Sequence, residues 1–442
     1  MHKISSKTLF SPVLIRRFVT NKNLGFNDPN HTRLVIIGAG YSGLQAAAHI
    51  PRLTTIGKYH MKAFDKSTFV HYTPFYDVVP FDLKTQEELE KPTLSVINET
   101  INIEFSAVES IKPDQNKIST INKEYTYDYL VLATGLNPNF EKIKGLEESL
   151  NDRECPVITT VQFADALKAK REFEFFHSGK VLFYNSGRAK VPYSGLNLAI
   201  LFEELIRKRG TGFRNMTDIS YITDQPIIFP HIKHSLKIQE ILRNKNINHE
   251  GTSLELIEVD GKARKATFLN KETNEKVIKE FDLLYVNPES ELPHALKGLA
   301  DSHGYLDINL NTLAHNKYNN IFALGHCART KDFITTPKAI TQQSVTVAGN
   351  LELTIQALSK GNKRPERYAK YSGYTVVPLF VGNQKILRIE LDPTQLDTFL
   401  EPSSVDYYKE LYVEPNIYFK LLTQGAWFGE SGFKKPRFPL TS

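Results

Sequence analysis

Short apolar runs alternate with segments of helical periodicity along most of this chain, which is the pattern of an α/β protein. The first run begins at Arg33 and leads through a glycine-rich turn into an alanine-rich stretch that reaches His49. This arrangement predicts one strand–turn–helix unit. Further buried strands are predicted at residues 61–64 and 130–133.

A second alternation begins at Val181 and predicts another α/β unit. Its predicted elements are a strand from Val181, a helix at about 196–208, and strands at 219–222 and 283–286. A strand at 318–325 and a long helix at 340–358 follow. From about Arg367 the sequence becomes rich in tyrosine, phenylalanine and proline, which indicates a separate C-terminal region.

Charge is concentrated at the N-terminus. The net charge is +6, and the first 27 residues supply five basic residues and no acid, which leaves about +1 for the rest. A basic, acid-free leader rich in serine and threonine is typical of a mitochondrial transit peptide, and a disordered basic tail is the alternative. We expect no nucleic-acid binding, because no basic excess remains elsewhere. No run of about 18 apolar residues occurs, so any membrane contact is expected to be peripheral.

Isolated reactive residues give no sign of a metal centre. Cys155 and Cys327 are far apart and lack the spacing of a zinc site or a disulfide framework, so we expect two ordinary thiols and no bound metal. Ser194, His231 and His234 also lack the mutual spacing of catalytic groups, and structural roles are expected for them.

A GxGxxG pattern, Gly38, Gly40 and Gly43, lies directly between the first predicted strand and helix. The first glycine permits the tight turn, the second lets the backbone approach a pyrophosphate, and the third lets helix and strand pack closely. The pyrophosphate then sits at the helix N-terminus. Asp65 ends the next strand, where an acid accepts hydrogen bonds from ribose hydroxyls. The alternative is a purely structural glycine turn.

Two later motifs suggest FAD rather than NAD. They are ATG, with Thr134 and Gly135, and FALGHC, with Gly325 and His326. The order of the three motifs resembles the flavoproteins with two dinucleotide-binding domains. The segments EKIKGL at 141–146 and YSGYTVVPL at 371–379 are similar to the mitochondrial sulfide:quinone oxidoreductase family. The resemblance extends from about Arg33 to Gly429.

This resemblance implies two Rossmann-like domains, the FAD-type domain being interrupted by the second, plus a C-terminal amphipathic helical region. The expected parts are a leader at 1–27, the FAD-type domain at 28–150 and 301–366, the second domain at 151–300, and a membrane-surface or docking region at 367–442. It also implies FAD as the cofactor and a quinone as a ligand.

Two residues bear on the implied cofactor. Family members carry Gly-Asp at the late motif, where the carboxylate is expected to bind the ribityl chain of FAD. This chain has His326, which cannot reproduce the charge or the several lone pairs of a carboxylate. Lys338 matches the region where the family has a lysine beside the flavin ring, and a cation there can stabilise a reduced flavin. A solvated lysine is the alternative.

The redox cysteines of the resembled family are missing. Sulfide oxidation needs a disulfide that sulfide attacks and a thiolate that passes electrons to the flavin. Matching the flanking residues places Val191, in AKVPYSG, and Val377, in GYTVVPL, at the two cysteine positions. Valine has no nucleophilic atom. We therefore predict that this chain does not oxidise sulfide and has no catalytic residue at these positions.

The remaining segments indicate what the fold is used for. No GxGxxG follows the Val181 strand, so no NAD(P) site is expected. Residues 405–428 predict two short amphipathic helices broken at Pro415. In the resembled family the C-terminal helices contact the membrane surface and guide quinone, whereas a core-packing aromatic cap or a surface for another protein is the alternative.

Two functions remain open at this point. The favoured hypothesis is a catalytically silent family member that is a structural or accessory subunit of a mitochondrial inner-membrane complex, peripheral to the membrane, with FAD either kept as a structural ligand or lost. The alternative is an active FAD-dependent quinone reductase whose electron donor is not sulfide.

Overall fold

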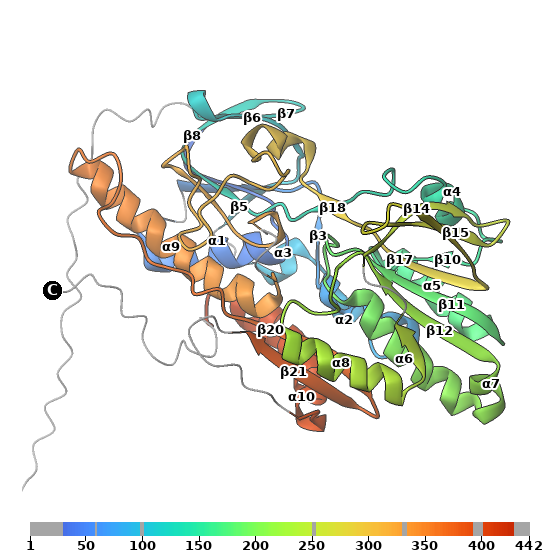
Figure 1. Ribbon diagram of the computed structural model, residues 1–442. Coiled ribbons are helices and arrows are strands. Elements are labelled where there is room, and N and C mark those ends of the chain that lie inside the picture. Colours follow the sequence, from blue (N-terminus) through green and yellow to red (C-terminus); the bar gives the residue numbers. More distant parts are fainter. Residues whose placement is uncertain are drawn as a thin grey trace, which may run out of the picture.

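The computed structural model describes residues 30–57, 60–97, 101–249, 253–328, 334–391 and 401–427. The predicted leader at 1–27 lies outside these ranges. Two α/β units lie side by side, and the C-terminal hairpin and helix run beneath them in the view of Figure 1. In the described part of the chain, no helix combines the length and apolar character needed to cross a membrane.

The first unit is built on a seven-stranded sheet. The strand order is β5-β2-β1-β8-β7-β6, and β19 also pairs with β8. The strands are β1 (His31–Ile37), β2 (Met61–Phe64), β5 (Asn102–Glu104), β6 (Val108–Lys112), β7 (Lys117–Thr120), β8 (Glu124–Leu132) and β19 (Ile321–Ala323). Strands β5, β2, β1, β8 and β19 are mutually parallel. Strand β7 pairs in antiparallel fashion with β8 on one side and with β6 on the other.

The second unit has a five-stranded parallel sheet in the order β10-β17-β11-β12-β13. Its strands are β10 (Val157–Ile158), β11 (Gly179–Asn185), β12 (Thr217–Thr223), β13 (Ile247–His249) and β17 (Leu283–Asn287). An antiparallel sheet of β14 (Leu254–Asp260), β15 (Lys265–Asn270) and β16 (Lys276–Glu280) is inserted before β17. The chain then returns to the first unit through β19, so the fold is the predicted pair of Rossmann-like units with the first interrupted by the second.

Helices cover both sheets because each parallel strand is buried and needs apolar cover. In the first unit, α1 (Tyr41–Leu53) packs against α9 (Pro337–Ser359). In the second, the main helices are α5 (Phe163–Phe175), α6 (Ser194–Arg209), α7 (Thr211–Asn215) and α8 (Ile232–Asn244). Short elements that bear on the site are the 3-10 helices η2 (Thr73–Phe81), η4 (His294–Leu299) and η5 (His326–Ala328). The residue boundaries between the predicted domains stay predictions.

Two predictions about single elements need correction. The strand expected at 318–325 spans only Ile321–Ala323, because Tyr318–Asn320 form a turn before it and Gly325 takes a φ of +78° after it. The break expected at Pro415 does not occur. The backbone stays helical through α10 (Ser404–Tyr408), η6 (Lys409–Val413), α11 (Glu414–Ile417) and η7 (Tyr418–Leu422). Pro415 lies in the first turn of α11, directly after the wide π turn of η6, where its missing N–H is tolerated.

The C-terminal region also contains a hairpin that the sequence analysis did not predict. Strands β20 (Thr375–Gly382) and β21 (Lys385–Leu391) pair in antiparallel fashion. The inward side chains of the hairpin, Val377, Leu379, Leu387 and Ile389, are buried in the core of the second unit. The hairpin therefore ties the C-terminal region to the second unit before the chain reaches the C-terminal helix.

Candidate dinucleotide site

The three glycines of the loop between β1 and α1 have different surroundings. A Cβ on Gly38 would lie 2.5 Å from the carbonyl oxygen of Ala133, and Gly38 has a φ of +97°. A Cβ on Gly43 would lie 1.7 Å from the carbonyl oxygen of Gly38. A Cβ on Gly40 would meet nothing within 4 Å. The loop therefore packs tightly at its first and third glycines and leaves open space at its second, where the predicted pyrophosphate approaches.

Asp65 holds the same loop from the end of β2. Its Oδ2 atom accepts a hydrogen bond from the backbone N–H of Ala39 at 2.6 Å, and its Oδ1 atom accepts one from Ser67 at 2.8 Å. The carboxylate lies in a cavity of about 230 Å³ that is also lined by Phe64, Lys66 and Thr134. Residues of η4, which packs against β6, also line the cavity. The cavity thus borders the loop at the place where a ribose is expected.

The ATG and late glycine motifs lie at the same edge of the sheet. Thr134 follows β8 and donates a hydrogen bond from its hydroxyl to the carbonyl of Gly135 at 3.0 Å. Gly325 follows β19, and a Cβ there would lie 2.5 Å from Ser42 Oγ in α1. Its N–H donates to Gln343 Oε1 at 2.8 Å. His326 is half-buried and begins η5. The structure therefore brings the GxGxxG, ATG and late motifs together at the carboxyl ends of β1, β8 and β19.

Lys338 is not a solvated lysine. It lies in the first turn of α9, and its Nζ is 2.5 Å from Glu414 Oε1 in the C-terminal helix. The two side chains are only 17% and 9% exposed. The positive charge of Lys338, which would face a flavin, is therefore already paired with the carboxylate of Glu414, a residue 76 positions later in the sequence.

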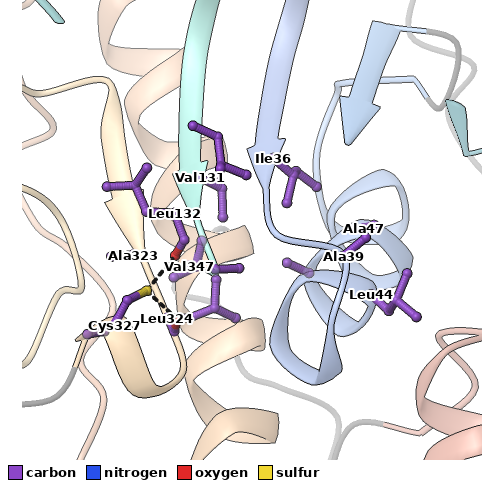
Figure 2. Packing of buried hydrophobic residues seen from close by; sticks show 14 of the residues in the cluster. Ile36, Ala39, Leu44, Ala47, Val131, Leu132, Ala323, Leu324, Cys327 and Val347 are labelled. Carbon is purple, nitrogen blue, oxygen red and sulfur yellow. Dashed lines mark hydrogen bonds between the residues drawn. The ribbon is translucent and has the colours of Figure 1, made fainter. Parts of the chain in front are cut away.

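The two cysteines lie apart in separate apolar clusters. Figure 2 shows Cys327 in η5, beside Leu132 and Leu324 at the ends of β8 and β19. Its Sγ lies 3.4 Å from the carbonyl oxygen of Leu132 and 3.3 Å from that of Leu324. Cys155 belongs to a cluster of the second unit with Leu146. Both thiols are free and buried, and burial raises the pKa of each. Neither thiol is placed to act as a redox nucleophile.

The two valine positions have different surroundings. Val377 is buried in β20 within the core of the second unit. Val191 lies in the loop before α6, and its carbonyl oxygen accepts a hydrogen bond from Asn287 Nδ2 at 2.9 Å. Val191 also lines a small cavity of about 20 Å³ between the two units. Both side chains are aliphatic, so neither position itself supplies a sulfur atom.

A buried polar cluster beside Val191 was missed by the sequence analysis. Asp77 of η2 accepts hydrogen bonds from Ser194 Oγ and, at 2.8 Å, from Thr160 Oγ1. The hydroxyl of Tyr285 lies 2.8 Å from Ser194 Oγ and 3.0 Å from Thr160 Oγ1. Burial raises the pKa of Asp77 to about 6, although the two hydroxyl hydrogen bonds oppose this shift. The cluster joins η2 of the first unit to β17 and α6 of the second.

The second unit has an acid at the position that matches Asp65. Asp224 directly follows β12, and its Oδ1 accepts a hydrogen bond from the N–H of Gly187 at 2.6 Å. A Cβ on Gly187 would lie 1.8 Å from Gln225 Nε2, so the glutamine side chain covers this loop. Lys271 Nζ is 3.1 Å from Asp224 Oδ2. The loop is therefore occupied by protein groups, and the expected lack of an NAD(P) site stays a prediction that this packing supports.

Comparison with known proteins identifies the family. The model of the pyridine nucleotide-disulphide oxidoreductase family matches residues 32–361. Mouse mitochondrial sulfide:quinone oxidoreductase is 30% identical over 418 residues, which cover 92% of this chain and 89% of the mouse protein. This chain belongs to the sulfide:quinone oxidoreductase family. FAD is the cofactor of that family and quinone its substrate.

Two solved structures show how far the sulfide:quinone oxidoreductase fold extends. The Aquifex aeolicus sulfide:quinone oxidoreductase has a TM-score of 0.75 and 18% identity, and the match covers 91% of this chain and 94% of that one. A chain of the Tetrahymena thermophila mitochondrial ATP synthase has a TM-score of 0.76 and 23% identity, and the match covers 91% and 98%. The fold of this family is thus found in a quinone reductase and in an ATP synthase assembly.

Proposed function

We propose that this chain is a sulfide:quinone oxidoreductase-like protein that does not oxidise sulfide and that is an accessory subunit of a mitochondrial membrane complex. The observation that carries the proposal is the replacement of both redox cysteine positions by Val191 and Val377. A sulfur relay needs two sulfur atoms that exchange a disulfide bond. Cys155 and Cys327 do not supply them, because each is buried in a different cluster.

The kind of complex is suggested by a structural neighbour. A chain of the Tetrahymena mitochondrial ATP synthase is similar to this one along nearly its whole length. Mitochondrial relatives at 27–30% identity support the same compartment. We therefore propose an ATP synthase or a comparable inner-membrane complex as the partner, with this chain held at its periphery.

The residues present fit one half of FAD better than the other. Gly40 leaves open space at the N-terminus of α1, and the cavity beside Asp65 fits the ADP half. At the flavin half, His326 replaces the carboxylate of the family, and Glu414 already neutralises Lys338. When bound, FAD supplies a two-electron carrier, whereas here Gly38, Gly40 and Asp65 would hold its ADP half. We propose that any FAD in this protein is a structural ligand.

The intact glycine loop also favours a second function. The open space at Gly40 allows the loop to bind the pyrophosphate of FAD. A redox-active FAD bound there would pass electrons to quinone from a donor other than sulfide. This is the alternative function, and one set of measurements separates the two.

The test combines spectroscopy with fractionation. The full-length protein is purified from mitochondria and its visible spectrum is recorded. Sulfide or another candidate electron donor is then added under anaerobic conditions, and a quinone is added afterwards. We expect no bleaching of any flavin band, with mouse sulfide:quinone oxidoreductase as the positive control. On native gels we expect the chain to migrate together with a mitochondrial membrane complex and to be present in a fixed ratio to its subunits. Flavin that is bleached by sulfide or another donor and reoxidised by quinone would falsify the silent-subunit proposal.

A further inference from the structure

The C-terminal segment lies along the whole length of α1. We call residues 404–427 the strap. At the N-terminal end of α1, the ring of Tyr41 stacks on Tyr418 with centroids 4.1 Å apart and planes at 15°. At the C-terminal end, Arg52 Nη2 donates a hydrogen bond to the carbonyl of Gln424 at 2.9 Å. The strap therefore covers the helix whose N-terminus forms the glycine loop.

The inward face of the strap carries two buried acids one helical turn apart. Glu410 and Glu414 are 6% and 8% exposed. Glu414 forms the ion pair with Lys338 described above. Among the described residues, the structure shows no hydrogen bond or ion pair for the carboxyl of Glu410. Two carboxyl groups of like charge thus lie one turn apart in a buried site, which is unfavourable unless one of them is neutral.

The charged and titratable groups around Glu410 come from every element that packs against it. They are Glu414 and Lys409 of the strap, Lys338 of α9, Arg388 of β21, Tyr41 of α1 and Tyr72 before η2. Burial and the charge of Glu414 raise the pKa of Glu410 to about 7, and the three cations only partly oppose this. The buried carboxyl therefore titrates near neutral pH.

We propose that the strap is a proton-controlled latch on α1, which stays docked while Glu410 carries a proton and loosens when Glu410 ionises beside Glu414. Releasing the strap uncovers Tyr41, which directly follows Gly40 in the dinucleotide loop. The latch thus controls the exposure of the first side chain of α1. This inference stands on the docking of the strap and does not depend on the proposed function.

The direction of the pH effect follows from the two states of Glu410. In the docked strap its pKa is about 7, above the ordinary value of 4.5 that applies after release. The docked state binds more protons, so docking is strongest at low pH and weakens as the pH rises through 7. The opening equilibrium changes by up to about tenfold per pH unit in this window, and it levels off above it.

Hydrogen exchange of the full-length protein tests the latch. Opening of the strap and of α1 is measured from pH 5.5 to 8.5, with exchange rates corrected for the intrinsic effect of pH. For the wild type we expect opening to increase roughly 10- to 30-fold from pH 5.5 to 7 and then to level off. E410Q should remove this dependence and keep the strap docked. E401Q, a change at an exposed acid, should behave as the wild type does.

A second variant separates a latch from a merely structural contact. K338M removes the cation paired with Glu414, so the remaining acids should release the strap at a lower pH than in the wild type. A structural contact alone would lower protection equally at every pH. The latch is refuted if E410Q keeps the wild-type pH profile, if E410Q leaves the strap open at all pH values, or if wild-type protection does not change with pH.

Discussion

At Gly43 a methyl group would collide with backbone, whereas at Gly40 it would enter open space. The Cβ of an alanine at 43 would lie 1.7 Å from the carbonyl oxygen of Gly38, and no flexible side chain is there to move aside. We expect Gly43→Ala to lower the free energy of unfolding by about 2–4 kcal/mol, because the helix and the strand must separate. Urea unfolding followed by circular dichroism measures this change.

Gly40→Ala is the matched control. Its free energy of unfolding should stay within about 0.5 kcal/mol of the wild type, because the new methyl group meets nothing within 4 Å. The same methyl group should weaken FAD binding in a fluorescence titration, since it occupies the space for the pyrophosphate. If Gly40→Ala bound FAD as the wild type does, the pyrophosphate would have to lie elsewhere.

The role of a residue could be predicted from the sequence where its spacing from neighbouring residues in a motif is enough to define that role. The three glycines needed only a strand before them and a helix after them, and the structure provides both. The pairing of Lys338 with Glu414 could not be predicted in this way, because the partners are joined only by tertiary packing. The same holds for Asp77, whose two hydroxyl partners, Thr160 and Ser194, come from separate segments.

Between elements, Asp77 is the polar link from η2 to α6 and β17. Its pKa of about 6 lies above the ordinary value of 3.8, so the folded state binds the proton more tightly than the unfolded state. This contribution to stability is complete below about pH 4, decreases as the pH rises through 6, and is flat above that. We expect the wild type to lose about 1–3 kcal/mol relative to Asp77→Asn between pH 4 and pH 8.

Unfolding of both proteins in urea at several pH values measures this difference. Asparagine keeps an oxygen that accepts the hydrogen bonds of the hydroxyls, but it cannot ionise. The contributions of all other titrating groups therefore cancel when the two proteins are compared. Asp77→Leu is the second control and should be destabilised at every pH, because it leaves Ser194 and Thr160 without their acceptor. If the free energies of unfolding of the wild type and of Asp77→Asn changed in parallel across the pH range, the carboxyl of Asp77 would not be buried as described.

The elements of the second unit were easier to predict than those of the C-terminal region. Buried parallel strands give continuous apolar runs, and these were recognised at β11, β12 and β17. The β20–β21 hairpin had a signal, because two runs rich in β-branched and aliphatic residues end and begin around the two-residue turn Asn383–Gln384, which follows Gly382. Pro378 within the first run obscured it, since proline is rare inside a sheet and tolerated at an edge.

For the whole molecule, the C-terminal helix has two chemically different faces. The inner face docks on the core through Glu414 and Tyr418. The outer face exposes apolar and aromatic side chains, namely Val405 at 77%, Tyr408 at 49%, Tyr412 at 48% and Val413 at 46%. Exposed aromatic residues on a helix are typical of a membrane interface or a protein interface. We therefore expect the proposed complex to contact this outer face.

Replacing Tyr408 and Tyr412 by serine tests that assignment at the level of assembly. We expect the double variant to fold normally, because both rings are about half exposed, but to shift from the membrane fraction to the soluble fraction of mitochondria. Loss of two interfacial tyrosines should cost about 2–4 kcal/mol of binding, enough to change a mostly bound protein into a mostly free one. Ile121 and Ile278 are exposed elsewhere, at 81% and 65%, and their serine variants should stay bound. Equal release of both sets would place the contact outside the C-terminal helix, and retention of both would remove the outer face as the docking surface.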